Sequence, residues 1–179
     1  MEVVQPIRNK EIIAQFKNVL LHKSYRDYIL FVIGINTGLR ISDILQLKVE
    51  DVKGSHIVIT EKKTNKHKRF YINEQLRKEL NKYIEGMNND DYLFTSRKGN
   101  KPITRVQAYR ILNEVADKLD VAEVGTHTLR KTFGYWHYQQ YKDVAILQDI
   151  FNHSSPSVTL RYIGITDDIK DKTIEGFYL

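Results

Sequence analysis

The sequence predicts a mainly α-helical domain of the α+β class that carries one small antiparallel β-hairpin. Over most of the chain, apolar residues recur every three or four positions, which is the period of an amphipathic helix. Between residues 57 and 72 this period gives way to two short β-rich runs separated by a polar connection. The length of 179 residues fits a single domain, and a hydrophobic content of 41% is sufficient for a core, which argues against a disordered chain.

Caps and apolar spacing predict the helices before the hairpin. Asn9 is suited to cap a helix whose apolar positions are Ile12, Ile13, Phe16, Val19 and Leu20. Residues 28–35 are apolar apart from Gly34, which predicts a helix buried on most sides. Gly38 stands where this helix would end, and a new helix is expected from about Arg40, with apolar positions at Ile41, Ile44, Leu45 and Leu47.

The hairpin is expected to pair residues 57–60 with residues 69–72 around a charged tip. Helical spacing returns over residues 74–84. Residues 88–91 and 96–100 are polar or glycine-containing, which predicts loops on either side of a short segment.

Four helix starts are expected in the second half of the chain. Thr104 and Gln107 form a capping-box pattern for a helix that reaches about residue 119. Thr126 is expected to cap the next helix, with His127 and Arg130 in its first turn. Asp143 starts a helix through Phe151, and Ser157 starts one that contains Tyr162.

The carboxyl terminus is predicted to be helical as well. Gly164 is expected to end the helix that contains Tyr162. An amphipathic helix over residues 167–177 follows, within a helical tail at residues 165–179.

Composition excludes several functional classes. The chain has 28 Lys and Arg against 22 Asp and Glu, and the net charge of +6 suits a polyanionic partner without establishing one. There is no cysteine, so disulfides, thiolate catalysis and cysteine-ligated zinc are excluded. The amino terminus lacks the pattern of a signal peptide, and the longest apolar run, residues 28–35, is too short to span a bilayer. No membrane partner is expected, and a cytoplasmic location is predicted.

Five residues spread over the sequence have the chemistry for cleaving a phosphodiester without a metal ion. They are two arginines, two histidines and a tyrosine: Arg40, His127, Arg130, His153 and Tyr162. Guanidinium groups neutralise a pentacoordinate phosphate, imidazoles move or hold protons, and a phenol can take the phosphate covalently. His127 and Arg130 are three residues apart at a predicted helix start, so their side chains leave on the same face.

Each of these residues also has a purely structural explanation. Arg40 can pair with Asp43, three residues later on the same helix. A histidine can cap a helix, an arginine can be an ordinary surface cation, and most tyrosines are half-buried amphipathic residues. The combination of the five residues, and no single one of them, indicates catalysis.

Basic residues outside this set suit contacts with phosphate groups. A lysine on a flexible hairpin, such as Lys63, can protonate a leaving oxygen, but four lysines and an arginine crowd this stretch and residue type alone does not select one. The side chains expected to touch phosphates are Lys66, Lys68, Arg97, Lys98 and Lys101, whose alternative role is solubility.

In their order and spacing, these segments resemble the catalytic domain of the tyrosine recombinases, the phage integrase family, from about residue 6 to residue 175. Thr37-Gly-Leu-Arg-Ile-Ser-Asp-Ile-Leu-Gln-Leu47 resembles the first-arginine box of the family, with Asp43 in the place of the supporting acid. Lys62-Lys-Thr-Asn-Lys66 and the strand after it resemble the hairpin with the catalytic lysine. The family pattern places this lysine at Lys63, with Lys66 as the alternative.

The last third carries the other boxes. His127-Thr-Leu-Arg-Lys-Thr-Phe133 resembles the His-x-x-Arg box, and Phe151-Asn-His-Ser-Ser155 resembles the Leu-Gly-His-Ser-Ser box. Tyr162 falls at the position of the nucleophile. Two departures, Phe151 for leucine and Asn152 for glycine, remove no catalytic group, and asparagine tolerates a positive φ.

The resemblance implies a site-specific DNA recombinase or integrase that cleaves and rejoins double-stranded DNA through a 3′-phosphotyrosyl intermediate, without metal, ATP or another cofactor. Tyr162 would attack the scissile phosphate, and Lys63 would protonate the leaving 5′ oxygen. His127 would take or relay the phenolic proton. The groups that would hold the phosphate oxygens are Arg40, Arg130 and His153.

The resemblance also implies an assembly. Family members usually carry a preceding core-binding domain that has no counterpart in residues 1–179, so a catalytic fragment of a longer integrase, or a naturally short relative, is expected. A homotetramer on DNA is expected for a full-length protein and a monomer for this piece, with a bacterium, phage or other mobile element as the source. The terminal helix can dock on a neighbouring subunit or on its own domain.

Three other functions remain open from the sequence. A type IB topoisomerase uses the same chemistry to relax supercoils. A DNA-binding module without activity would bind DNA in a salt-sensitive way and form no covalent adduct. A metal-dependent nuclease has only the acidic pair Asp90-Asp91 in its favour, which suits an ordinary turn.

Overall fold

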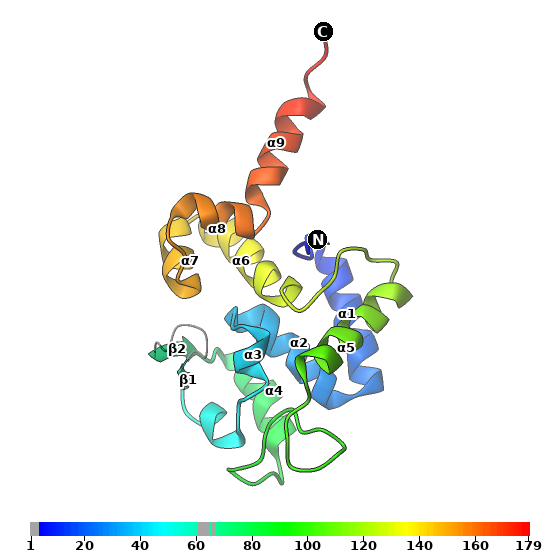
Figure 1. Cartoon of the computed structure of the whole chain (residues 1–179), viewed down its shortest axis with the longest axis vertical. Helices are drawn as coiled ribbons and strands as arrows, with labels where there is room; N and C mark the ends of the chain where they lie inside the picture. Colours follow the sequence, from blue (N-terminus) through cyan, green and yellow to red (C-terminus); the bar gives the residue numbers. More distant parts are fainter. Residues whose placement is uncertain (1–3, 61–64, 66) are drawn as a thin grey trace.

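The computed structural model describes residues 4–60, 65 and 67–179, and this part of the chain is mostly helical with one two-stranded antiparallel sheet (Figure 1). The elements in order are α1 (Lys10–Lys23), α2 (Tyr25–Thr37), α3 (Ile41–Ile44), the 3-10 helix η1 (Val49–Val52), β1 (His56–Thr60), β2 (His67–Tyr71), α4 (Glu74–Ile84), α5 (Arg105–Lys118), α6 (Thr128–Tyr141), α7 (Val144–Phe151), α8 (Pro156–Tyr162) and α9 (Ile165–Glu175). The predicted fold class is confirmed.

Helix α2 lies at the centre of the fold. It is buried from Asp27 through Gly34, and it packs against α1, α4 and α6. A Cβ atom on Gly34 would lie 2.5 Å from Leu129 Cδ1, so the missing side chain is what allows α6 to approach this closely. Helix α2 is apolar but has only 13 residues. No helix in the described ranges is long and apolar enough to cross a membrane.

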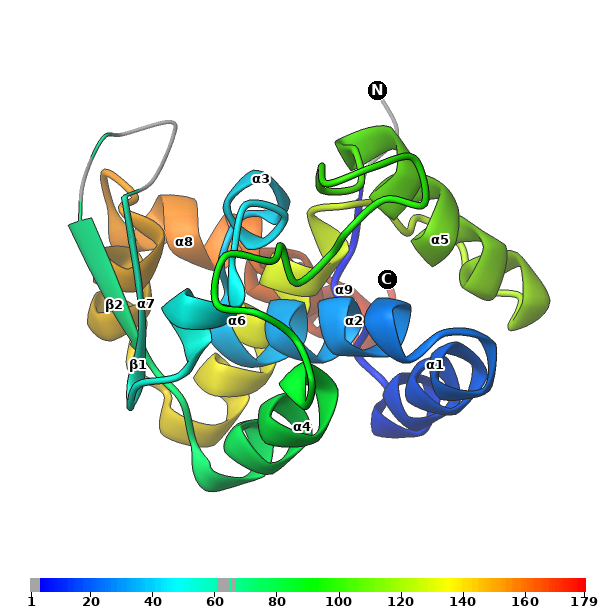
Figure 2. The same cartoon turned by 90° about the horizontal axis from the view of Figure 1, so that it is seen from below.

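The hairpin lies beside α7 at one end of the molecule (Figure 2). Its register pairs Ile57 with Phe70 and Ile59 with Lys68. Because side chains alternate along a strand, Phe70 is buried and Lys68 is half-buried, whereas their neighbours on β2 are exposed. The predicted hairpin is confirmed, with each strand one or two residues from its expected bounds. Most of its predicted tip, residues 61–64 and 66, lies outside the described residues.

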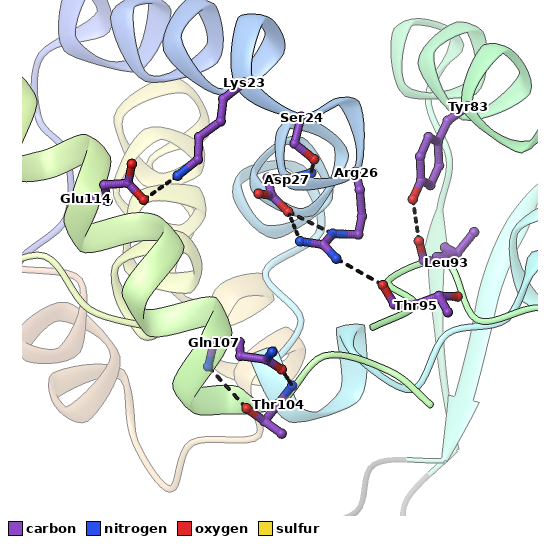
Figure 3. A network of polar contacts seen from close by, with 10 residues as sticks. All are labelled: Lys23, Ser24, Arg26, Asp27, Tyr83, Leu93, Thr95, Thr104, Gln107 and Glu114. Carbon is purple, nitrogen blue, oxygen red and sulfur yellow. Dashed lines mark hydrogen bonds and ion pairs between the residues drawn. The ribbon is translucent and has the colours of Figure 1, made fainter. Parts of the chain in front are cut away.

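Several predicted helix ends are confirmed by their hydrogen bonds. Asn9 Oδ1 accepts from the backbone N–H of Glu11 at 2.7 Å, and Asp143 Oδ1 accepts from that of Ile146 at 3.1 Å. Both hydrogen bonds of the capping box between Thr104 and Gln107 are formed (Figure 3). Gly38 ends α2 with a φ of +66°, a left-handed conformation that favours glycine.

Two predicted helix caps are wrong, by one residue at α6 and by two at α8, and α9 begins two residues before its predicted start. Helix α6 begins at Thr128, because Thr128 Oγ1 accepts from the N–H of Gly125 at 3.0 Å and closes a turn that precedes the helix. Thr126 is therefore not the cap, and His127 occupies that position. Helix α8 begins at Pro156, with Ser155 rather than Ser157 as its cap, since proline is preorganised for the first helical position. The helix expected from Arg40 is a single turn, α3.

A small second core fixes α8 on α6. It contains the buried residues Leu147, Phe151, Ile163 and Ile165. A Cβ atom on Gly134 would lie 2.6 Å from Ile163 and 2.7 Å from Phe151, so this glycine lets α7 and α8 pack directly on α6. Beyond Gly164 the chain turns, and α9 projects away from the body of the molecule (Figure 1).

Candidate active site

The predicted phosphate-binding arginines meet in one hollow. It has a volume of about 190 Å³ and is lined by Arg40, Ile41, Ser42, Arg105, Thr126, His127 and Arg130. These residues come from the junction of α2 and α3, the start of α5 and the start of α6. Three guanidinium groups and an imidazole around one hollow form a site for an anion, and the planar guanidinium group is suited to a phosphate.

Arg130 joins three parts of the site. Its side chain is buried, and Nη1 donates to the carbonyl of Gly38 at 2.6 Å while Nη2 donates to that of Phe151 at 3.0 Å. The guanidinium also lies 4.4 Å from the centre of the Phe151 ring. Arg130 therefore connects the end of α2 with the end of α7, and these contacts hold the guanidinium in position before any ligand binds.

The predicted nucleophile lies against His127. Tyr162 Oη is 3.3 Å from His127 Nδ1. The ring of Tyr162 packs against those of Phe151 and His153, with centroids 5.5 and 5.0 Å apart, and Lys131 Nζ lies 5.2 Å from its centre. Burial raises the pKa of the Tyr162 phenol, and the nearby arginines Arg130 and Arg40 oppose this shift. The phenol is thus protonated at neutral pH and needs a base to become a nucleophile.

His127 is suited to be that base. Burial lowers its pKa below the ordinary value, and the positive charges of Arg105, Arg130, Lys131 and Arg40 lower it further. The imidazole is therefore neutral at neutral pH, and a neutral imidazole can accept the phenolic proton across the 3.3 Å contact.

His153 also contacts the ring of Tyr162. It occupies the turn between α7 and α8, where Nδ1 is 3.0 Å from the hydroxyl of the buried Thr159. Burial lowers the pKa of His153 to about 4, with further effects of Arg130, Arg40 and Lys68. Asn152, just before it, adopts the positive φ of +54° that the sequence allowed for. The turn holds the imidazole of His153 in place, and the contact with Thr159 uses Nδ1, one of the two ring nitrogens.

The fold thus brings together the five residues predicted to cleave a phosphodiester. The other predicted site residues do not all lie with them. Asp43 is buried in α3 close to Arg40 in sequence, and its supporting role stays a prediction. Lys63 and Lys66 lie outside the described residues. Arg97, Lys98 and Lys101 are exposed in the loop before α5 and do not line the hollow.

Lys68 has a structural role that the sequence did not indicate. Its ammonium group donates to the backbone carbonyls of Asp149, at 3.0 Å, and of Ile150. These carbonyls belong to the last turn of α7, where a cation is favourable. Lys68 therefore ties the hairpin to the turn that carries His153, and its predicted contact with DNA stays a prediction.

Replacing Lys68 with methionine is expected to lower the free energy of unfolding by about 1 kcal/mol, because two carbonyls and a helix end lose a charged donor. Urea unfolding of Lys68→Met measures this, with Arg69→Met on the outward face of the same strand as the control. If Lys68 serves only to bind DNA, both variants will unfold alike and only DNA binding will weaken.

Sequence reasoning missed Arg105 and Thr159. Arg105 follows the capping threonine of α5 and carries no motif of its own, although a basic residue directly after a predicted cap is a weak signal of an anion site. Thr159 is separated from His153 by six residues, and only the turn between α7 and α8 brings them into contact.

Comparison with known proteins identifies the family of the chain. The fold and the site define a tyrosine recombinase catalytic domain. The sequence profile of the phage integrase family matches residues 6–168, and the chain belongs to this family. It is 54% identical over 169 residues to the probable integrase/recombinase YoeC of Bacillus subtilis (strain 168), which covers 94% of this chain and 93% of that protein.

More distant relatives are longer. A tyrosine recombinase of Pseudothermotoga lettingae is 30% identical over 183 residues, and the match covers 93% of this chain but 63% of that protein. Among solved structures, XerA recombinase has a TM-score of 0.75 at 21% identity, over 98% of this chain and 65% of XerA. XerH bound to its difH substrate in a pre-cleavage complex has a TM-score of 0.72 at 21% identity, over 90% of this chain and 51% of XerH. These structures share the fold.

Proposed function

We propose that this protein cleaves and rejoins double-stranded DNA at specific sites through a covalent link between DNA and Tyr162. One observation carries the proposal. The phenolic oxygen of Tyr162 lies 3.3 Å from His127, whose imidazole lines a hollow together with the guanidinium groups of Arg40 and Arg130. This arrangement supports the assignment of a nucleophile, a base and an anion site within one chain.

The chemical step follows from this arrangement. As His127 takes the phenolic proton, the oxygen of Tyr162 attacks the scissile phosphorus, and the bond from phosphorus to the 5′ oxygen breaks. The products are a 3′-phosphotyrosyl link and a free 5′-hydroxyl, whose proton we assign to Lys63. Because the link keeps the energy of the phosphodiester, attack by a 5′-hydroxyl of another strand reverses the step without ATP.

The charges of the hollow act on the transition state. The pentacoordinate phosphate carries more negative charge on its nonbridging oxygens than the ground state does, so fixed donors stabilise it selectively. We assign these contacts to Arg40, Arg130 and His153. Arg130 is prepared for this contact, since the carbonyls of Gly38 and Phe151 hold its guanidinium in place.

Double-stranded DNA is the proposed partner. The net charge of +6 and the exposed basic loop with Arg97, Lys98 and Lys101 support it, as do the DNA complexes of XerH and of the Tn1549 transposon integrase, which share this fold. We further propose a homotetramer on DNA in the cytoplasm of a bacterial cell. The exposed apolar residues of the C-terminal tail support docking on a neighbouring subunit: Ile169, Ile174, Phe177, Tyr178 and Leu179.

A covalent trap tests the proposal. Duplexes of randomised sequence with a nick just 3′ of the presumed cleavage position lose the short fragment that carries the new 5′-hydroxyl after attack, so the adduct cannot be reversed. We expect wild-type protein to yield a band that survives SDS and disappears with protease, and peptide mapping to place the phosphoryl group on Tyr162. If no sequence yields an adduct, the proposal is wrong and a DNA-binding module remains.

A second assay separates recombination from relaxation. The duplex recovered in the trap is placed twice in one plasmid, and the products are examined by gel electrophoresis. Exchange between the two copies supports a recombinase, whereas relaxation of supercoils without exchange supports a type IB topoisomerase.

A further inference from the structure

Arg105 lines the hollow next to the three residues that the sequence placed there. It is the first residue of α5, and its side chain is exposed. Within the described ranges of the chain, its guanidinium takes part in no hydrogen bond or ion pair. No contact with the described residues explains why an arginine lines this hollow.

Positive charge gathers around Arg105, which favours the binding of an anion. The first turn of a helix carries partial positive charge, and the first turn of α5 contains no acidic residue to offset it. The hollow also holds the guanidinium groups of Arg40 and Arg130. After burial, the charge of Arg105 is the strongest of the effects that lower the pKa of His127. A bound phosphate would relieve all of these repulsions.

The backbone of Arg105 is held firmly. The capping box between Thr104 and Gln107 fixes the first turn of α5, with hydrogen bonds of 2.8 and 3.2 Å (Figure 3). Further along α5, Glu114 pairs with Lys23 at the end of α1. The side chain of Arg105 therefore extends from a fixed backbone position at the edge of the hollow.

We propose that Arg105 is a third guanidinium ligand of the DNA backbone at the scissile phosphate, in addition to Arg40 and Arg130. This inference rests on the proposed function. A bidentate contact from α5 would hold the phosphate between α3, α5 and α6 and neutralise charge that develops on it. Arg105 lines the hollow, whereas Arg97 and the other basic residues of the preceding loop lie outside it.

The placement of Arg105 has a consequence for pH dependence. The groups that face His127 are Arg105 from α5, Arg130 and Lys131 from α6, Arg40 from the start of α3 and Tyr162 from α8. Cleavage needs neutral His127, so its rate falls as the pH drops through the pKa of this imidazole. Removing the charge of Arg105 removes a repulsion from the imidazolium, which raises that pKa and moves the acidic limb of the rate profile to higher pH.

The experiment measures adduct formation at saturating protein on the nicked duplex recovered with the wild-type protein. The variants are Arg105→Gln and Arg105→Lys, with Arg110→Gln, an exposed arginine of the same helix outside the hollow, as the control. We expect Arg105→Gln to slow adduct formation on the order of 10²-fold, as removal of one preorganised donor does, and to shift the acidic limb upward. Arg105→Lys keeps the charge, so the acidic limb of its rate profile should lie at the same pH as that of the wild type. Arg110→Gln should match the wild type in both the rate of adduct formation and the position of the acidic limb.

Suppose that the wild type forms the adduct, and that Arg105→Gln and Arg110→Gln have the same rate of adduct formation and the same acidic limb. This result would overturn the inference about Arg105 and leave the proposed function intact. If the wild type forms no adduct, the proposed function fails, and the salt dependence of binding to an unselected duplex decides the role of Arg105. Loss of one phosphate contact lowers the slope of log K against log salt by about one unit. A slope unchanged in Arg105→Gln, relative to Arg110→Gln, would exclude contact with the DNA backbone.

Discussion

Replacing Tyr162 with phenylalanine is expected to abolish the covalent protein–DNA adduct and leave the fold intact. The variant lacks the oxygen that attacks phosphorus, and loss of a nucleophile typically costs on the order of 10⁴-fold or more in rate. The aromatic ring still packs against Phe151 and His153. Because only a hydroxyl contact of 3.3 Å is lost, the free energy of unfolding should change by less than about 1 kcal/mol.

The measurement is the trap with the nicked duplex, followed over a pH series. Tyr141→Phe, which removes an exposed hydroxyl from α6, is the matched control and should react like the wild type. The wild-type rate should persist below the ordinary pKa of histidine and then fall, because the pKa of His127 is lowered and its neutral form is needed. An adduct of normal yield in Tyr162→Phe would mean that another tyrosine is the nucleophile.

Replacing Arg130 with lysine is expected to impair both catalysis and stability, although the charge is kept. A lysine cannot donate at the same time to Gly38, to Phe151 and to a phosphate in the geometry of a guanidinium. The rate of adduct formation should fall about 10²–10³-fold, as when one preorganised donor is lost. A buried carbonyl left without its donor should lower the free energy of unfolding by about 2 kcal/mol.

The control for Arg130→Lys is Arg26→Lys. Arg26 also holds structure together, through an ion pair of 2.7 Å with Asp27 and a hydrogen bond of 3.0 Å to the carbonyl of Thr95 (Figure 3), but it does not line the hollow. Urea unfolding and adduct formation are measured for both variants at a temperature where both are folded. If the two variants lose stability to the same extent and only Arg130→Lys loses cleavage, the catalytic effect is separate from the structural one. Equal cleavage by both would remove Arg130 from the phosphate site.

Much of the local structure was predictable because short-range interactions determine it. The caps at Asn9, Thr104 and Asp143 and the left-handed Gly38 follow from residues no more than four positions apart. The two misplaced caps lie where several residues of capping type are neighbours in the sequence. At α8 the choice fell to Ser155, since the proline after it is suited to the first helical position.

The sequence by itself determined which residues have the chemistry for cleavage, because residue types and their order along the chain are sufficient for that. Tertiary structure decided which of the many basic residues line the hollow. Arg130 contacts Gly38 across 92 positions, and Lys68 contacts Asp149 across 81. Such contacts depend on how helices pack, here through the missing side chains of Gly34 and Gly134, and no periodicity in the sequence encodes that. For this reason Lys68 faces α7, whereas Arg105, which carries no motif, faces the site.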